Sequence, residues 1–185
     1  MTLFAGLGNP AREYENTRHN AGFLTADELI RRLKPSDVSK SAFRGSLYRS
    51  DDLLILKPLT YMNNSGASVR SVADFYGIGT LIVAHDDLDL SFGALRFKRG
   101  GANGGHKGLK SIDALYGADY LRVRIGIGRP ANSDVISYVL SAWSEMEREE
   151  LKAVLSRAAD ATLALLAEPL ERVRSEFTQK GVFDA

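Results

Sequence analysis

The chain has 185 residues, of which 44% are hydrophobic and 25% charged, and its formal net charge is +1. This composition fits one globular domain over residues 1–185 with a single sizeable core, and no run of about 18 apolar residues exists to form a membrane-spanning helix. The absence of cysteine excludes disulfides, cysteine-bound metals and thiol nucleophiles, and it fits a cytoplasmic protein, as does an amino-terminal segment without a secretory signal.

In the first half of the chain, short apolar runs alternate with amphipathic stretches. Phe23, Ala26 and Ile30 recur at helical spacing, and Pro35 ends the helix that they predict. The segments predicted in chain order are a strand over 2–6, a helix over about 20–32, a loop over 36–45, strands over 47–48 and 53–56, and a helix that follows the loop 60–66 and ends at Gly77.

The second half continues the alternation, and it begins with an apolar run at 81–84 that is typical of a buried strand. After it we expect an edge or antiparallel strand over 94–98, a glycine-rich loop over 100–108, a helix to about 115, a strand over 120–127, a short helix near 133–140, a long helix over about 144–166 and a loose carboxyl terminus. The pattern predicts a single-domain α/β sandwich, with a mixed, mostly parallel sheet flanked by helices.

Four polar loops each follow an apolar strand. Because loops at the carboxyl ends of parallel strands meet in one crevice, we expect these loops to form a single pocket. The loops are 6–22, 58–66, 85–89 and 99–108, and the pocket would contain Asn9, His19, Asn20, Asn63, Asp86, Asn103 and His106.

His19 is the best candidate for a general base, because an imidazole titrates near neutral pH. Asp86 is its natural partner, since a carboxylate can fix the tautomer and stabilise the charged ring. Two plainer roles stay open: His19 as a helix-entry residue bonded to backbone, and Asp86 as a turn residue. No G-x-S-x-G nucleophile motif occurs.

The asparagines and the glycine-rich loop are less specific signals. Asn9 can either bond its own turn or offer its amide to a substrate amide, and Asn63 and Asn64 can either bind substrate or cap the helix that follows. The loop 100–108 is rich in backbone N–H groups that suit an anion or an ester oxygen, but it lacks the phosphate-loop and dinucleotide-binding spacings.

A metal site is conceivable from composition alone. His85, Asp87 and Asp89, together with His19 and His106, offer imidazole and carboxylate ligands. Their spacing matches no H-x-x-x-H or H-E-x-x-H motif, so we expect neither a metal nor another cofactor.

The charges are distributed unevenly along the chain. Residues 94–130 contain eight Lys/Arg against Asp113 and Asp119, whereas residues 141–176 contain eight Asp/Glu against five Lys/Arg. A basic middle beside an acidic tail favours one face that binds a polyanion, although two ordinary solvated faces would give the same count.

The polar loops together resemble bacterial peptidyl-tRNA hydrolase. The shared motifs cover about residues 1–130 and occur in the family's order: GLGNP, Y-x-x-T-R-H-N-A-G from Tyr14, Y-M-N-x-S-G from Tyr61, H-D-D-L-D from His85, a G-G-H block and R-I-G-I-G-R-P from Arg124. The resemblance implies a monomeric, metal-independent α/β hydrolase that cleaves the ester between a peptide and the 3′-terminal ribose of tRNA.

The resemblance also implies roles for single residues. His19 would activate water, Asp86 would orient His19, and Asn9 would sense the blocked amino group of the substrate. The residues expected to line the substrate and tRNA site are Tyr14, Tyr61, Met62 and Asn63, with Lys98 and Arg124 holding the 5′-phosphate and backbone of the tRNA.

Two positions depart from the family's pattern. Lys107 stands where the family usually has an Asn that positions substrate, so that contact is lost, or Lys107 binds phosphate, or Asn103 substitutes. Ala11 stands where the family favours Gly after GNP, which we expect to be only a backbone adjustment. The alternatives to this hydrolase are a non-catalytic RNA-binding module of the same fold, a metal-dependent hydrolase and a hydrolase of another acyl ester.

Overall fold

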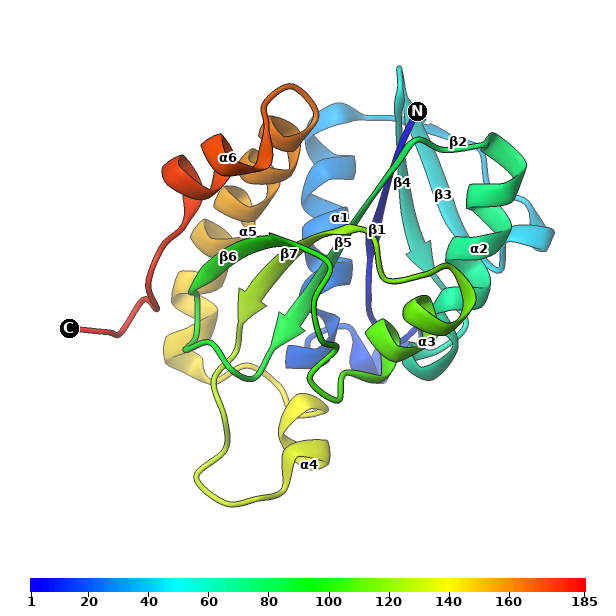
Figure 1. Ribbon diagram of the computed structural model, residues 1–185. Coiled ribbons are helices and arrows are strands. Elements are labelled where there is room, and N and C mark those ends of the chain that lie inside the picture. Colours follow the sequence, from blue (N-terminus) through cyan, green and yellow to red (C-terminus); the bar gives the residue numbers. More distant parts are fainter.

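The computed structural model describes residues 1–185 as one seven-stranded mixed sheet in the order β2-β3-β4-β1-β5-β7-β6 (Figure 1). The four central strands β4, β1, β5 and β7 run parallel, and β2, β3 and β6 are antiparallel to their neighbours, which confirms the predicted fold class. The strands are β1 (Thr2–Gly6), β2 (Ser36–Asp37), β3 (Gly45–Ser50), β4 (Leu53–Pro58), β5 (Thr80–Asp87), β6 (Leu95–Arg99) and β7 (Leu121–Gly126).

Helices cover both faces of the sheet. On one face lie α1 (Ala21–Leu33), α5 (Glu145–Leu165) and α6 (Leu170–Phe177), and on the other α2 (Ser65–Tyr76) and α3 (Lys107–Leu115). The short α4 (Val135–Val139) lies beyond the carboxyl ends of the central strands, at the bottom of Figure 1. Four 3-10 turns complete the chain: η1 (Arg12–Tyr14), η2 (Arg18–Asn20), η3 (Ser41–Phe43) and η4 (Met62–Asn64). No helix has the length and apolar character needed to cross a membrane.

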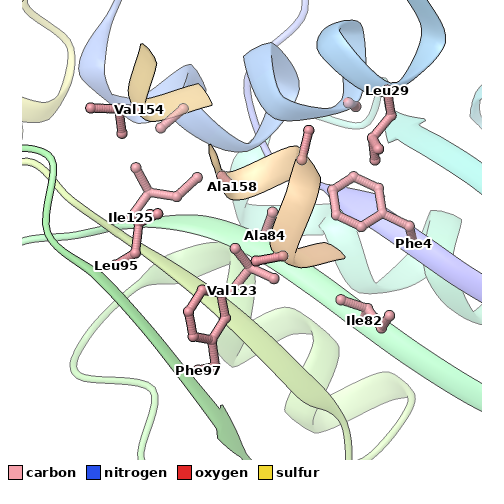
Figure 2. Packing of buried hydrophobic residues seen from close by; sticks show 14 of the residues in the cluster. Phe4, Leu29, Ile82, Ala84, Leu95, Phe97, Val123, Ile125, Val154 and Ala158 are labelled. Carbon is pink, nitrogen blue, oxygen red and sulfur yellow. The ribbon is translucent and has the colours of Figure 1, made fainter. Parts of the chain in front are cut away.

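The period of two in the buried strands separates two cores. In β1, Phe4 faces α1 and α5, whereas Leu3 and Ala5 face α2 and α3, and all three side chains are fully buried. Figure 2 shows the first core, where Phe4 packs near Leu29 of α1 and Ile82 of β5. Burying a side chain of this size stabilises the fold by roughly 1.5–3 kcal/mol, so the sheet is held firmly from both faces.

Three predictions about elements were wrong. The predicted loop 36–45 contains β2 and η3, because Phe43 is buried there against α2. β5 continues through Asp87, so the polar motif that starts at His85 begins inside the strand. Helix α6 was not predicted, because its sequence is mostly polar and buries only Val173.

The carboxyl terminus is also better ordered than predicted. Gln179 bridges to Leu95 of β6, and the N–H of Val182 donates to the carbonyl of Phe92 at 2.8 Å. The ring of Phe183 stacks on Phe92 with centroids 5.8 Å apart. Long-range contacts of this kind leave no periodic signal in the sequence, which explains the failure.

Candidate active site

A cleft of about 710 Å³ opens at the carboxyl ends of the parallel strands, under α4. It is lined by loops that follow β1 and β4, by the end of β5, by strands β6 and β7, and by the glycine-rich segment before α3. Most of the residues expected from the sequence to form the site line it: Asn9, Tyr14, His19, Tyr61, Met62, Asn63, Asp86, Lys98, Asn103 and Arg124. His106 lines it as well, whereas Asn20 is buried beneath it.

His19 and Asp86 form a hydrogen-bonded pair at the centre of the cleft. The His19 Nδ1–H donates to Asp86 Oδ2 at 2.8 Å, and His19 makes no hydrogen bond through Nε2. Asp86 is held rigidly because it belongs to β5, and His19 sits in the turn η2 between β1 and α1. The side chains of His19 and Asp86 therefore bond each other and do not take the plainer roles left open for them. His19 Nε2 remains available to a ligand in the cleft.

Gly22 brings the turn that contains His19 close to the sheet. A Cβ at this position would lie 2.3 Å from the nitrogen of Leu7 and 2.4 Å from the carbonyl oxygen of Ala84. The first turn of α1 therefore sits directly on the ends of β1 and β5, where the N–H of Phe23 donates to the carbonyl of Leu7 at 2.9 Å. The close approach fixes the distance between η2 and β5.

The electrostatics of the pair favour an ionised Asp86. Burial by itself raises the pKa of Asp86, but the facing imidazoles of His19 and His106 outweigh burial and hold the pKa far below its usual range. Burial by itself lowers the pKa of His19, but the charge and hydrogen bond of Asp86 outweigh it, so the pKa of His19 is raised above its ordinary value, with Lys107 opposing. The carboxylate thus makes His19 a stronger base than a free imidazole.

His106 contacts the second oxygen of the same carboxylate. Its Nε2–H donates to Asp86 Oδ1 at 2.8 Å, while its Nδ1 accepts from the N–H groups of Gly108 and Leu109 at 3.1 and 3.3 Å. Since Nδ1 caps helix α3, the proton of the ring is on Nε2. His106 therefore positions Asp86 and is not free to act as a base.

Asn9 is oriented by three hydrogen bonds. Its backbone exchanges two bonds with the side chain of Asn20, at 2.8 and 3.0 Å, and its Oδ1 accepts from the N–H of Met62 at 2.8 Å. The amide oxygen is thereby occupied, and the Nδ2 group makes no hydrogen bond within the protein. Asn9 therefore offers the cleft a donor, rather than both the N–H and C=O groups expected from the sequence.

Tyr61 and Asn63 form the edge of the cleft beside Asn9. Tyr61 is half exposed, has a positive φ of 63° and packs edge-on against Tyr14 with ring centroids 6.5 Å apart. A positive φ in a non-glycine residue stores strain, which is common at binding sites. The side chain of Asn63 makes no hydrogen bond, and Asn64 makes no side-chain cap on α2, so the capping role left open for these residues is not seen.

Three cations gather on the opposite side of the cleft. The register of β6 and β7 places Lys98 opposite Arg122, and Arg124 follows two residues later on the same face. Burial, together with Arg122 and Arg124, lowers the pKa of Lys98. Asp87 opposes the cluster, in an ion pair of 2.8 Å with Arg124. Like charges facing each other across a ladder are unfavourable, so this arrangement suits a bound anion.

Asn103 and Lys107, which the sequence suggested as substitutes for the Asn that the family usually has, behave differently. Asn103 lines the cleft, but its Oδ1 accepts from the N–H of Gly105 at 2.9 Å and its Nδ2 lies 3.5 Å from Asp113 Oδ2. Its amide therefore shapes the loop and is not free to replace the missing Asn. Lys107 also lines the cleft, at the start of α3, and its ammonium makes no hydrogen bond or ion pair.

A cluster of His19, Asp86 and His106 places three potential metal ligand atoms within 4.8 Å of one another. In the structure His19 Nδ1 and His106 Nε2 both donate to the Asp86 carboxylate, so these facing atoms are occupied by hydrogen bonds. Of the other residues considered as ligands from the sequence, Asp87 pairs with Arg124 and Asp89 pairs with Arg129 at 2.5 Å. The donor set therefore does not call for a metal.

Arg122 and the structural role of His85 were not predicted from the sequence. The Arg122 Nε–H donates to His85 Nε2 at 3.1 Å, and its Nη1 donates to the carbonyls of Gly100 and Ala102 at 3.2 and 3.0 Å. Burial first, and then His106 and Arg122, keep the pKa of His85 well below its ordinary value. The spacing of two in Arg122-Val-Arg124 was a usable signal, since it puts both arginines on one face of a strand.

Arg18 connects η2, the turn that contains His19, with α4 and α5. It forms a buried ion pair with Glu147 at 2.6 Å, bonds Ser141 Oγ and the carbonyl of Ala142, and lies 4.3 Å from the ring centroid of Tyr138. Its neighbour His19 therefore depends on the same segment that carries the apolar wall of the cleft.

Comparisons with known proteins agree with this geometry. A sequence model described as peptidyl-tRNA hydrolase matches residues 3–183. A peptidyl-tRNA hydrolase from Sulfurovum sp. is 50% identical, covering 98% of each chain, and one from Campylobacter fetus is 52% identical, covering 98% of this chain and 100% of the relative. A crystal structure of peptidyl-tRNA hydrolase from Acinetobacter baumannii superposes with a TM-score of 0.91 at 33% identity, covering 98% of this chain and 96% of the other.

Proposed function

The chain belongs to the peptidyl-tRNA hydrolase family and is a hydrolase that acts on peptidyl-tRNA, and on that premise we propose that His19, Asp86 and Asn9 carry out the cleavage of its ester bond. The observation that supports this assignment most strongly is the pair of His19 and Asp86, in which Nδ1 faces a buried carboxylate and Nε2 is left for water. An ester with an alcohol leaving group can be hydrolysed by water directly, so the mechanism needs no nucleophilic side chain.

The reaction begins when His19 Nε2 takes a proton from a water molecule. The resulting hydroxide attacks the ester carbonyl carbon, while Asp86 keeps the Nδ1 proton in place and stabilises the imidazolium. The tetrahedral intermediate then collapses, the bond to the ribose oxygen breaks, and His19 Nε2–H returns its proton to that oxygen. General-base help of this kind accelerates a reaction by typically about 10²–10⁴-fold. The products are free tRNA and a peptide acid.

Asn9 supplies the selection for a blocked amino group. Its Nδ2 group is a donor, so it can bind the carbonyl oxygen of the amide in peptidyl-tRNA. A free α-ammonium group presents only N–H donors, so in aminoacyl-tRNA the two donors would face each other without a bond. Asn63 offers a second free amide toward the acyl side, beside Tyr14, Tyr61 and Met62.

The tRNA side of the substrate is assigned to the cationic cluster. Lys98 and Arg124 would contact the 5′-phosphate and backbone, and Arg122 supports them from below. All of these groups come from one chain, so the proposal requires only a monomer.

The test is release of free tRNA from N-acetyl-aminoacyl-tRNA, with chelator present, beside the unblocked aminoacyl-tRNA and a His19→Ala variant. The proposal predicts that only the blocked substrate is cleaved and that the variant loses activity by at least about 10²-fold. Recovery of lost activity on adding metal would instead assign the cluster at Asp86 to a metal-dependent hydrolase. An active His19→Ala variant would remove His19 from the mechanism.

A further inference from the structure

A second groove of about 520 Å³ meets the catalytic cleft at Tyr61, which lines both. We name it the Arg44 groove, and its other residues come from the segment around η3, the start of β3 and the loop after β4. Besides Tyr61, its lining residues with polar side chains are Ser39, Lys40, Ser41, Arg44, Ser46, Thr60 and Asn64. Because the two hollows share Tyr61, a ligand too long for the cleft can continue into this groove.

The Arg44 groove carries positive charge and hydrogen-bond donors. None of its lining residues is acidic, and the guanidinium of Arg44 makes no hydrogen bond or ion pair. The Lys40 ammonium lies over the ring of Phe75, 4.4 Å from the centroid, and makes no ion pair. Such a set of groups binds carbonyl oxygens and carboxylates, since lysine and arginine donate and do not accept.

The position of the groove relative to the catalytic pair indicates which part of a substrate reaches it. His19 and Asp86 lie at the ends of β1 and β5, and the sheet continues from there to β7 and β6 on one side and to β4 and β3 on the other. The cluster at Lys98 lies on the first side and the Arg44 groove on the second. At a strand spacing of about 4.8 Å, the two basic regions are separated by several strands and cannot serve one phosphate.

Asn9 gives the direction of the acyl part. Its side chain is bonded to the N–H of Met62, the residue that follows Tyr61, so the group proposed to sense the blocked amino end is on the side of the Arg44 groove. With tRNA over β7 and β6, the peptide leaves the catalytic pair over Tyr61.

We propose that the Arg44 groove binds the peptide of peptidyl-tRNA, at residues upstream of the esterified one, and favours acidic side chains there. This inference rests on the proposed function, because it takes the ester to lie at His19. The hydroxyl and amide groups bind backbone carbonyls of any sequence, and Arg44 and Lys40 add a preference for Asp or Glu. RNA is the less favoured occupant, because the cluster at Lys98 already lies on the opposite side of the ester.

The test uses three substrates on the same tRNA: N-acetyl-aminoacyl-tRNA, and two N-acetylated tripeptidyl-tRNAs that differ only in Glu or Lys upstream of the esterified residue. Wild-type kcat/KM is expected to be about fivefold higher for Glu than for Lys, the size of an exposed ion pair. Arg44→Glu is expected to reverse this order and to leave N-acetyl-aminoacyl-tRNA unchanged. Arg174→Glu on α6 changes the net charge equally, far from the groove, and is expected to behave as wild type.

Each other outcome has a definite meaning. Equal losses on all three substrates in Arg44→Glu, with a weaker dependence on salt, would make this an RNA groove and overturn the proposal. Equal rates for Glu and Lys substrates in both wild type and variant would overturn it as well. Failure of the proposed function is distinguishable, because it would appear as no cleavage of N-acetyl-aminoacyl-tRNA by the wild-type protein.

Discussion

The Asp86 carboxylate contacts two imidazoles that play different parts. His106 donates to Asp86 through Nε2 and caps helix α3 through Nδ1, whereas His19 contacts Asp86 through Nδ1 and leaves its Nε2 toward the cleft. One buried charge therefore orients His19, raises the pKa of His19 and is itself kept ionised by the two rings that face it. In the proposed mechanism, the action of His19 as a base therefore depends on Asp86.

The Asp86→Asn variant tests that statement through its pH profile. In the wild type, kcat/KM is expected to rise with pH as His19 loses its proton, with an apparent pKa above the ordinary value of 6.5. Without the carboxylate, burial and Lys107 still lower the pKa of His19, so the acid limb is expected to move to lower pH while the plateau falls by about 10²-fold or more. A plateau that falls without any movement of the limb would show that Asp86 does not set this pKa.

Asn9→Asp tests how the substrate is selected. The substitution keeps an oxygen for the N–H of Met62 but turns the donor in the cleft into a charged acceptor, which favours a free ammonium over an amide carbonyl. We expect the ratio of kcat/KM for blocked over unblocked substrate to fall by at least about tenfold, since a mispaired buried polar group costs about 1–3 kcal/mol. Asn63→Asp makes the same change at a neighbouring amide and serves as the comparison. If the ratio is unchanged in Asn9→Asp, as well as in Asn63→Asp, Asn9 does not select the substrate.

Ala11 adopts a backbone conformation suited to glycine. Its φ of 95° and ψ of 144° lie where side chains are rarely found, so the residue has kept the geometry of a glycine rather than adjusting it. Such strain costs on the order of 1–3 kcal/mol, partly offset by the greater freedom of glycine when unfolded. Ala11→Gly is therefore expected to stabilise the protein by about 1 kcal/mol, or roughly 2–4 °C in Tm, measured by thermal unfolding. Ala153→Gly in α5 should lower Tm, and the same sign for both variants would contradict the explanation.

At the scale of elements, η2 and α4 act as one unit. Thr17 bridges to Ala142, the N–H of Arg18 donates to the carbonyl of Ser141 at 3.1 Å, and Glu147 balances the buried guanidinium. Since α4 supplies Val135 to the wall of the cleft, His19 and this wall are held in place by the same contacts.

Arg18→Lys is expected to loosen this unit without removing its charge. A lysine cannot make the forked contacts to Ser141, Ala142 and Glu147 at once, so we expect kcat/KM to fall by about 10–100-fold, the usual effect of losing a group that orients a catalytic residue. Arg32→Lys is the matched control, because Arg32 joins α1 to Asp160 and Ser156 of α5 away from the cleft. If kcat/KM falls by a similar factor in both variants, Arg18 contributes only to the stability of the fold and does not position His19.

Elements with strong periodicity could be predicted from the sequence, and elements made by distant contacts could not. β1 was predicted to the residue, and α2 ends at Gly77 with a left-handed φ of 59°, as its glycine indicated. The convergence of the loops was predictable because parallel strands share one end. The tautomer of His106, the orientation of the Asn9 amide and the Arg18–Glu147 pair depend on partners far away in the chain, and no local pattern encodes them.

Across the whole molecule, the uneven charge of the sequence becomes a functional arrangement. The basic middle of the chain supplies Lys98 and Arg124 to the cleft, whereas the acidic carboxyl-terminal part forms α5 and α6, which cover the face away from α2 and α3. A polyanion approaching the molecule is therefore attracted to the edge of β6 and β7 and is repelled by the helices behind it. The net charge of +1 hides this separation.

Salt dependence measures the separation directly. Each phosphate contact that releases a counterion contributes about −0.7 to −0.9 to the slope of log affinity against log salt concentration. Lys98→Ala is expected to raise the KM for N-acetyl-aminoacyl-tRNA and to reduce the magnitude of this slope by about the contribution of one phosphate contact. The kcat at saturation is expected to stay unchanged, because Lys98 does not contact the reacting atoms. Lys152→Ala, on the acidic helix α5, removes the same charge and is expected to leave the slope unchanged. A fall in kcat with an unaltered slope would instead show that Lys98 acts on the reaction itself. The cluster that it forms with Arg122 and Arg124 would then stabilise the reacting ester and would not bind a phosphate of the tRNA.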